Sequence, residues 1–231
     1  MIIIGHRGCA GEEPENTLRS FVRAIEEGAH MIELDARLTK DGRLAVIHDA
    51  SLNRTTNGKG QVSEKTMEEL KEFDAGKGEK IPSLEEAIEA IDERVPILIE
   101  LKSVGSAKAL KDIISFYVSE GWSSRDFMVC SFEHDELRLF SEICPEVKIG
   151  VLEVPLGSAE YAEELGAYSV NIDFEGATEE FIKDAHNRGI NVFVWTINEP
   201  ERIMELKNKG VDGVITDFPG IARKTLTGRG F

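Results

Sequence analysis

The chain has 231 residues, of which 41% are hydrophobic and 30% are charged, and this composition excludes a disordered segment and indicates a folded globular protein with a large core. The formal net charge of −16 repels nucleic acids and anionic membrane surfaces, so we expect no nucleic-acid partner and no stable membrane association. An anionic small molecule would need a bound cation or a few basic side chains at its own site.

Short apolar segments rich in β-branched residues recur along the chain, and each predicts a β-strand. Eight of them are expected to run in one direction, at residues 2–5, 31–35, 97–102, 127–132, 148–152, 169–173, 191–196 and 213–217. Most of the segments between them carry helix signals. Asn16 or Thr17 can cap the first helix, and Ser83 with Glu86 forms a capping box before a later one. Asn198 with Glu201 suggests another.

The segment 44–48 also reads as a strand, but too few residues separate it from 31–35 for a crossover helix. Asp41-Gly42 is a two-residue hairpin signal, so we expect the second strand to turn there and return antiparallel. Paired residue numbers would then sum to 83, which sets His48 opposite Asp35. The hairpin would gather His48, Asp35 and Glu33 on one face.

Residues 51–80 are polar and rich in glycine, and we interpret them as a small insertion over the barrel mouth. Composition changes sharply nowhere, so residues 1–231 are expected to form a single domain. Eight strands alternating with helices predict an α/β protein of the TIM (β/α)8 barrel type, with a β-hairpin and the insertion after strand 2. A doubly wound open sheet is the alternative.

Active sites of TIM barrels lie at the carboxyl ends of the strands, and the polar residues there are concentrated early in this chain. Glu33 and Asp35 end the second strand, and Glu100 and Lys102 end the third. By strand alternation these side chains face the barrel interior, and Ile97, Ile99 and Leu101 face the helices. Three converging carboxylates would repel one another without a cation. Their oxygen-only ligand set predicts a divalent metal site for Mg²⁺ or Ca²⁺.

Arg7 and Lys102 supply basic groups beside these acids, and both are expected to bind phosphate. The alternative is a salt-bridge network in which the carboxylates pair with Arg7, Arg37 and Lys102. Because Arg7 directly follows His6, both can reach one ligand only if the chain turns at Gly8.

His6 and His48 lie at neighbouring strand ends beside the acidic cluster, which suggests general acid and base roles because imidazole titrates near neutral pH. Metal ligation is the other role open to them. Trp195, and with a weaker case Phe132, can form an apolar wall for the organic part of a substrate. Asp217 and Asn171 also end or lie in strands, but helix capping or core hydrogen bonding explains them equally well.

The chain contains three cysteines, Cys9, Cys130 and Cys144, with no metal-type spacing and no disulfide framework, which favours a reducing compartment. The apolar run after Met1 is too short for a signal peptide or a membrane helix. We therefore expect a cytoplasmic protein.

Nine short motifs, spread in order over nearly the whole chain, resemble those of the glycerophosphodiester phosphodiesterase family. They are His6-Arg7-Gly8, Pro14-Glu15-Asn16-Thr17, Glu33-Leu34-Asp35, Thr39-Lys40-Asp41-Gly42, His48-Asp49, Arg54-Thr55-Thr56, Glu100-Leu101-Lys102, Val194-Trp195-Thr196 and Gly213-Val214-Ile215-Thr216-Asp217. The resemblance implies metal-dependent hydrolysis of a glycerophosphodiester to glycerol 3-phosphate and an alcohol.

The resemblance further implies that Glu33, Asp35 and Glu100 hold the metal, that His6 and His48 act as acid and base, and that Arg7 and Lys102 bind phosphate. We take His6 as the base and His48 as the acid. Two rival functions stay open at this point: a lysophospholipase D or sphingomyelinase D type reaction on lipids, and a phosphate-binding barrel without catalysis. The absence of an amphipathic stretch in residues 51–80 favours the small, water-soluble substrate over a lipid.

Overall fold

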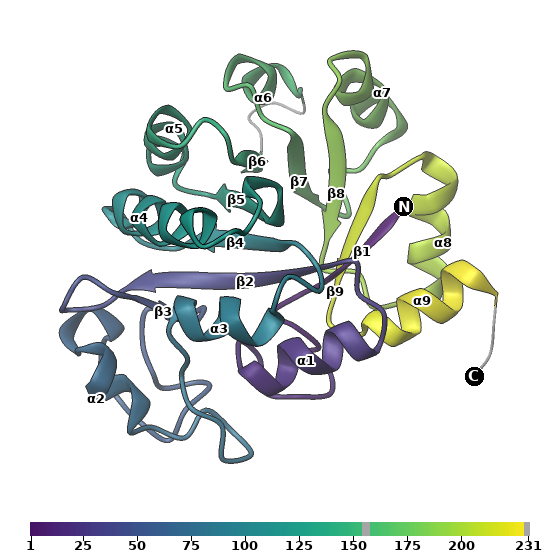
Figure 1. Ribbon diagram of the computed structural model, residues 1–231. Helices are drawn as coiled ribbons and strands as arrows, with labels where there is room; N and C mark the ends of the chain where they lie inside the picture. The colour runs from purple at the N-terminus through teal and green to yellow at the C-terminus, as the bar shows by residue number, and fades with distance from the viewer. Residues whose placement is uncertain (154–157, 229–231) are drawn as a thin grey trace.

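The computed structural model describes residues 1–153 and 158–228, and within them one sheet of nine strands is surrounded by helices (Figure 1). Eight strands are parallel and in chain order, and β1 pairs with both β9 and β2, so the sheet closes into a barrel. The eight parallel strands are β1 (Ile2–Gly5), β2 (Met31–Leu38), β4 (Ile97–Leu101), β5 (Phe127–Ser131), β6 (Lys148–Leu152), β7 (Ser169–Asp173), β8 (Asn191–Trp195) and β9 (Gly213–Thr216). The predicted TIM barrel is confirmed, and the open sheet is excluded.

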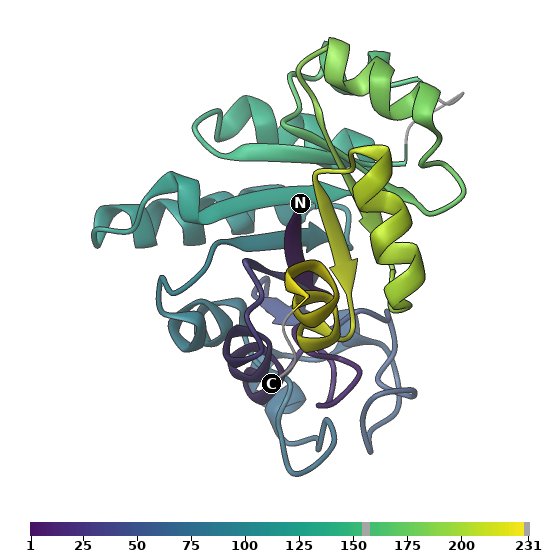
Figure 2. The same ribbon diagram turned by 90° about the vertical axis from the view of Figure 1, so that its right-hand side faces the viewer.

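Helices follow the strands and form the outer layer. They are α1 (Leu18–Glu26), α3 (Leu84–Ile91), α4 (Ser106–Ser119), α5 (His134–Ile143), α6 (Glu160–Glu164), α7 (Glu179–Asn187), α8 (Pro200–Lys209) and α9 (Pro219–Thr227), and a short 3₁₀ helix, η2 (Ser124–Asp126), precedes β5. Figure 2 shows α8 and α9, in yellow-green and yellow, against the outside of the barrel. No helix among the described residues is both long enough and apolar enough to cross a bilayer.

Helix starts follow the local sequence at two of the three predicted caps. The Thr17 hydroxyl caps α1, and Ser83 with Glu86 forms the expected capping box of α3. The prediction for α8 was wrong, because this helix begins after Glu199 with Pro200 in its first turn. Asn198 instead hydrogen-bonds Thr216 at the end of β9 and Asp217 directly after it, and this places its side chain near the cleft described below.

The core has two layers separated by the sheet. One lies between the strands and the helices and includes Ile97, Ile99 and Leu101, the face predicted for them. The other fills the barrel and consists of Ile4, Leu98, Met128, Cys130, Leu152, Phe193 and Ile215. Each fully buried Leu, Ile or Phe side chain stabilises the fold by about 1.5–3 kcal/mol through removal of apolar surface from water.

The hairpin after β2 exists, but its predicted register was wrong. Ala36 pairs with Val46 and Leu38 with Leu44 of β3 (Leu44–Val46), so paired numbers sum to 82 rather than 83. The loop has three residues, because Thr39 N–H donates to the Arg43 carbonyl (2.9 Å) and Gly42 takes a positive φ of 78°. His48 therefore does not lie opposite Asp35. Ile47 takes that place, since its N–H donates to the Asp35 carbonyl (3.0 Å), and the chain bends at His48.

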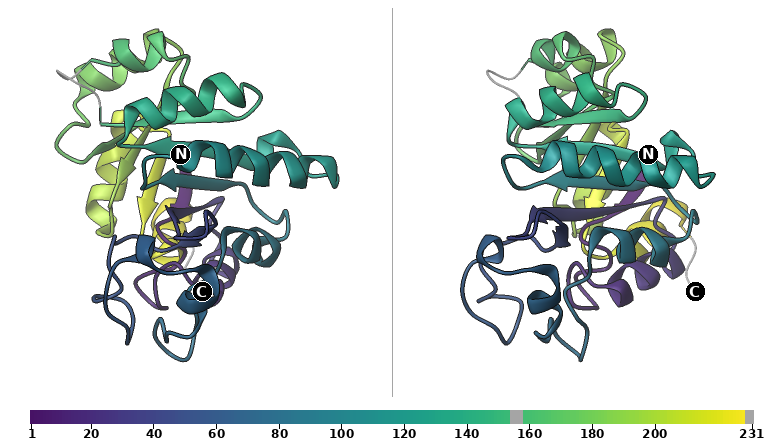
Figure 3. Two further views of the ribbon diagram at one scale, coloured as in Figure 1. Left: turned by 90° about the vertical axis from the view of Figure 1, so that its left-hand side faces the viewer. Right: turned by 60° about the vertical axis from the view of Figure 1, so that its left-hand side comes forward.

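The segment 51–80 is a lobe beside the barrel that includes η1 (Val62–Glu64) and α2 (Met67–Lys71) and is seen in blue in Figures 1 and 3. It buries a small core of its own against β3 and the residues that follow it. This core contains Ala45, Ile47, Leu52, Val62, Met67, Leu70, Ala75 and Ile81. All of residues 51–80 are described, and none of them lines the cleft at the barrel mouth.

Candidate active site

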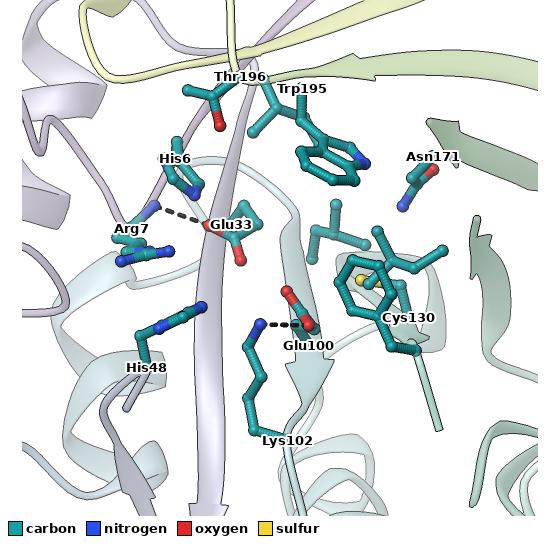
Figure 4. A pocket seen from close by; sticks show the side chains of 14 residues that line it. His6, Arg7, Glu33, His48, Glu100, Lys102, Cys130, Asn171, Trp195 and Thr196 are labelled. Carbon is teal, nitrogen blue, oxygen red and sulfur yellow. Dashed lines mark hydrogen bonds and ion pairs between the residues drawn. The ribbon is translucent and has the colours of Figure 1, made fainter. Parts of the chain in front are cut away.

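A cleft of about 210 Å³ opens at the carboxyl ends of the strands (Figure 4). It is lined by His6, Arg7, Glu33, His48, Leu98, Glu100, Lys102, Cys130, Phe132, Leu152, Asn171, Trp195, Thr196 and Ile215. Of the nine predicted site residues, eight line this cleft, and the ninth, Asp35, is buried directly beside it. The strand ends thus bring together residues that lie far apart in the chain.

Glu33, Asp35 and Glu100 form the acidic side of the cleft, with one oxygen from each within 4.8 Å of the others. Asp35 on β2 is the register partner of Glu100 on β4, and Glu33 lies two residues before Asp35 on the same face. All three carboxylates are buried. The predicted convergence is therefore present in the structure.

Burial and mutual repulsion shift the titration of these acids. Burial and the charge of Asp35 raise the pKa of Glu33 to about 8 and the pKa of Glu100 to about 7. Burial also acts to raise the pKa of Asp35, but the cations Lys102 and Arg7 outweigh it and hold that pKa below its ordinary value. The site thus contains more negative charge than its own cations neutralise.

Two basic side chains neutralise part of this negative charge. Lys102 forms ion pairs with Glu100 and, at 3.3 Å, with Asp35. Arg7 Nε lies 3.2 Å from Asp35 Oδ2. Arg37 makes no such pair among the described residues, because its guanidinium donates to the backbone carbonyls of His48 and Lys102. The alternative salt-bridge network is therefore present in part, without Arg37.

The residues present fit a divalent cation. Asp35 Oδ1 and Glu100 Oε1 are buried, and their one partner among the described residues is the Lys102 ammonium, which lies at ion-pair distance from both oxygens. Three carboxylates against Lys102 and Arg7 leave one excess negative charge, which a divalent cation and a singly charged phosphodiester would together balance. Oxygen ligands of this kind suit Mg²⁺ or Ca²⁺.

A tight turn after β1 directs both His6 and Arg7 into the cleft. Arg7 and Gly8 both have positive φ, 50° and 86°, and Gly8 N–H donates to the Gly5 carbonyl (3.2 Å). A Cβ atom on Gly8 would overlap Ser20 of α1. The turn also aims the Arg7 N–H at Glu33 Oε2 (2.7 Å), which anchors a carboxylate of the acidic cluster. The turn expected at Gly8 is confirmed.

Each histidine is held by a carboxylate at Nδ1. His6 Nδ1 lies 2.7 Å from Asp217 Oδ1, and His48 Nδ1 lies 2.7 Å from Asp49 Oδ1. Because a carboxylate can only accept, each Nδ1 carries the shared hydrogen, so Nε2 is the nitrogen of each ring that can exchange a proton with a ligand. Figure 4 shows the two rings on the same side of the cleft. Burial lowers the pKa of His6, but the hydrogen bond to Asp217 and the negative charges of Glu33 and Asp217 together outweigh burial and raise that pKa. The pKa of His48 is lowered, chiefly by burial.

The opposite side of the cleft is mostly apolar. The rings of Phe132 and Trp195 meet edge to face with centroids 5.9 Å apart, and the Phe132 side chain is 43% exposed at the mouth. The Lys102 ammonium lies 5.5 Å from the Phe132 ring centroid. These two aromatic residues occupy the positions expected of an apolar wall.

Comparison with known proteins identifies the family of the whole chain. Residues 6–221 match the model of the glycerophosphoryl diester phosphodiesterase family. The chain belongs to this family. A glycerophosphodiester phosphodiesterase of Bacillus altitudinis is 38% identical over 236 residues, which cover 96% of each chain. One from Caldanaerobacter subterraneus is 37% identical over 94% of each chain. An Oleispira antarctica phosphodiesterase, solved in complex with the product sn-glycerol-3-phosphate, matches with a TM-score of 0.91 at 29% identity, covering 98% of this chain and 96% of that one.

In this family member, residues outside the cleft hold the residues that line it. Arg54 of the lobe donates to both oxygens of Asp49 (2.8 and 2.9 Å) and to both oxygens of Glu15 (2.7 and 2.8 Å). Glu15 in turn accepts from Arg7 Nη1 (2.6 Å). One guanidinium on the lobe therefore ties together the partner of His48 and the partner of Arg7.

Two asparagines complete this support, and sequence reasoning assigned them no such role. Asn16 donates to Asp35 Oδ2 (2.7 Å) and accepts from Asp35 N–H (3.2 Å), which fixes a predicted metal ligand. Asn198 donates to Asp217 Oδ2 (2.8 Å). Among the supporting residues, only Asp49 could have been found from the sequence, because it is a carboxylate directly after His48.

Proposed function

We propose that this phosphodiesterase hydrolyses glycerophosphodiesters to glycerol 3-phosphate and an alcohol, with one Mg²⁺ or Ca²⁺ ion held by Glu33, Asp35 and Glu100. The observation that carries the proposal is the convergence of three buried carboxylates and two imidazoles on one cleft. The relatives described above support the substrate class.

When bound, the cation would act as a Lewis acid toward a phosphate oxygen. Arg7 would grip the phosphate from the wall of the cleft, where Asp35, 3.2 Å from Nε, and Glu15, 2.6 Å from Nη1, hold its guanidinium in place. Lys102 would neutralise further phosphate charge from the side of Glu100. Both cations lie in a protein of net charge −16, so the attraction for the anionic substrate is local.

His6 and His48 would carry the protons. One imidazole Nε2 takes a proton from the hydroxyl group that attacks the phosphorus atom. The other supplies a proton to the oxygen of the leaving alcohol. Asp217 and Asp49 fix the tautomers in which Nε2 faces the ligand, by the same logic as the carboxylate of a catalytic triad. Neither ring is needed as a metal ligand, because three carboxylates suffice.

The test is release of glycerol 3-phosphate from glycerophosphocholine, with and without EDTA. We expect EDTA to abolish turnover and Mg²⁺ or Ca²⁺ to restore it. His6→Ala, His48→Ala and Glu100→Ala should each reduce kcat by about a hundredfold or more, the lower end of acid and base contributions. His186→Ala, which alters a histidine paired with Asp212 outside the cleft, is the matched control.

Two results would contradict the proposal. Faster turnover of lysophosphatidylcholine than of glycerophosphocholine would assign a lipid substrate instead. Absence of turnover on every glycerophosphodiester, with either metal present, would leave a binding protein without catalysis.

A further inference from the structure

Two buried hydrogen-bond donors face the apolar side of the cleft and have no acceptor among residues 1–153 and 158–228. They are Asn171 Nδ2 on β7 and Trp195 Nε1 at the end of β8, and neither donates to any described residue. Asn171 is fully buried. Figure 4 shows the indole nitrogen turned toward Asn171 and the Asn171 amide nitrogen turned toward the cleft. Buried donors in native structures are nearly always paired, so two together indicate a place for an acceptor.

The Asn171 amide is held with its nitrogen toward the cleft. Ser169, two residues earlier on the same face of β7, donates its hydroxyl to Asn171 Oδ1 (2.7 Å), so the oxygen is occupied and the nitrogen is left over. Gly150 on β6 makes room for this pair, because a Cβ there would come within 2.7 Å of Ser169 Oγ and 3.1 Å of Asn171 Nδ2. The donor is thus presented by three residues on neighbouring strands.

The surroundings define the kind of acceptor. Around the two donors the cleft is lined by Leu98, Cys130, Leu152 and Ile215, all apolar and without charge. The described cations of the cleft, Arg7 and Lys102, lie with the acidic cluster instead. An uncharged oxygen on a short carbon chain, such as a hydroxyl group, matches two neutral donors among apolar walls better than a carboxylate or a phosphate does.

We propose that Asn171 and Trp195 form a subsite that recognises a hydroxyl oxygen of the substrate's glycerol moiety, an inference that rests on the proposed function. With the phosphate at Arg7 and Lys102, one substituent of the diester extends toward these donors and the other leaves through the mouth. The end at Asn171 is closed by the barrel interior and suits the short glycerol. The leaving alcohol, whose size varies, fits the open side, where Phe132 is 43% exposed.

The test compares two competitive inhibitors that differ only in hydroxyl groups, glycerol 3-phosphate and propyl phosphate. For the wild-type enzyme we expect glycerol 3-phosphate to bind at least about tenfold more tightly, because the analogue leaves buried donors unpaired. Trp195→Phe removes the indole N–H but keeps a ring, and Asn171→Leu removes the amide at similar volume. Each should bring the ratio of the two inhibition constants down toward one, mainly by weakening glycerol 3-phosphate.

Matched controls are available in the same chain. Trp122→Phe and Asn191→Leu change the other tryptophan and another asparagine, neither of which lines the cleft, and both should keep the wild-type ratio. Thermal unfolding of each variant monitors folding. Trp195→Phe is the decisive variant if Asn171→Leu fails to fold.

The outcomes separate this inference from the proposed function. If the wild type turns over glycerophosphocholine but both variants keep the wild-type ratio, the donors hold only water and the inference is wrong. Equal weakening of both inhibitors would likewise overturn it, by showing a structural role. Absence of wild-type turnover, by contrast, rejects the proposed function.

Discussion

The carboxylate behind His6 belongs to the last strand end of the barrel, and it sets how that ring titrates. Asp217 raises the pKa of His6 through its hydrogen bond, against the lowering effect of burial. Asp217 is itself held by Asn198, so its position is fixed from a neighbouring strand end. The acid or base role proposed for His6 thus depends on a residue that is not expected to touch the substrate.

Replacing Asp217 with Asn removes the charge but keeps a side chain of the same shape. Because Asp217 raises the pKa of His6, we expect the limb of the pH profile of kcat/KM that reports His6 to move to lower pH. The maximum should fall by about tenfold to a hundredfold through loss of the correct tautomer. The measurement is kcat/KM from about pH 5 to about pH 9. Asp212→Asn, beside His186 outside the cleft, should leave the profile in place, and an unmoved limb in Asp217→Asn would contradict the prediction.

These supporting contacts were beyond the reach of the sequence because they join distant positions. His6 and Asp217 are 211 residues apart, and no local pattern pairs them. Asp217 and Asn171 were noticed as polar strand residues, but capping or core hydrogen bonds explained them equally well. Glu33, Asp35, Glu100 and the two histidines could be found because each ends an apolar run, and only the closed barrel shows which of their neighbours hold them.

At the level of elements, the β2–β3 hairpin and the lobe that follows it connect the cleft to the periphery. The sequence predicted the strands, their direction and the hairpin, since these depend on apolar periodicity and on Asp41-Gly42. It missed the register by one residue, because a three-residue loop with Gly42 at positive φ gives the same local signal. It also missed the core of the lobe, whose apolar residues are too widely spaced to form a periodic pattern.

Arg54 is the contact by which the lobe reaches the catalytic groups, and its removal is expected to affect activity more than stability. Arg54→Met leaves Asp49 and Glu15 without their shared partner, so we expect kcat/KM to fall by about tenfold, the scale on which partners of site residues act. Its ion pairs are partly exposed and should stabilise the fold by no more than about 1 kcal/mol. Steady-state kinetics and urea unfolding measure the two effects.

Lys77→Met is the matched control for this prediction. Lys77 belongs to the same lobe, is exposed to a similar degree, and pairs with Glu13 (2.8 Å), which does not line the cleft. It should leave kcat/KM unchanged. Equal losses in the two variants would show that the lobe acts through its overall stability rather than through Arg54.

For the whole molecule, the raised pKa values of Glu33 and Glu100 link metal binding to stability and pH. A carboxyl whose pKa is higher in the folded protein than in the unfolded chain favours folding below the unfolded pKa, and this contribution is lost as pH rises through the folded pKa. The metal-free protein should therefore lose stability from about pH 5 up to about pH 8 through these two groups, and the gain in Tm on adding Mg²⁺ or Ca²⁺ should grow over the same interval.

Thermal unfolding in EDTA and in excess metal, at a series of pH values, measures this linkage. In the Glu33→Gln variant the side chain at this position is neutral at every pH. Its metal-free form should therefore lose less stability between about pH 5 and about pH 8 than the wild type does. A gain in Tm that is the same at every pH, or that shrinks as pH rises, would contradict the proposed ligands.

The small core of the lobe has a consequence for how the enzyme fails on heating. Because its apolar residues form a cluster apart from the two barrel cores, the lobe can unfold as a separate cooperative unit while the strands of the barrel stay paired. Opening would withdraw Arg54 from Asp49 and Glu15 and so loosen the groups around the phosphate. We therefore expect heating to abolish activity locally, before the barrel that carries the cleft unfolds, so that the residues of the lobe limit the working temperature of the enzyme.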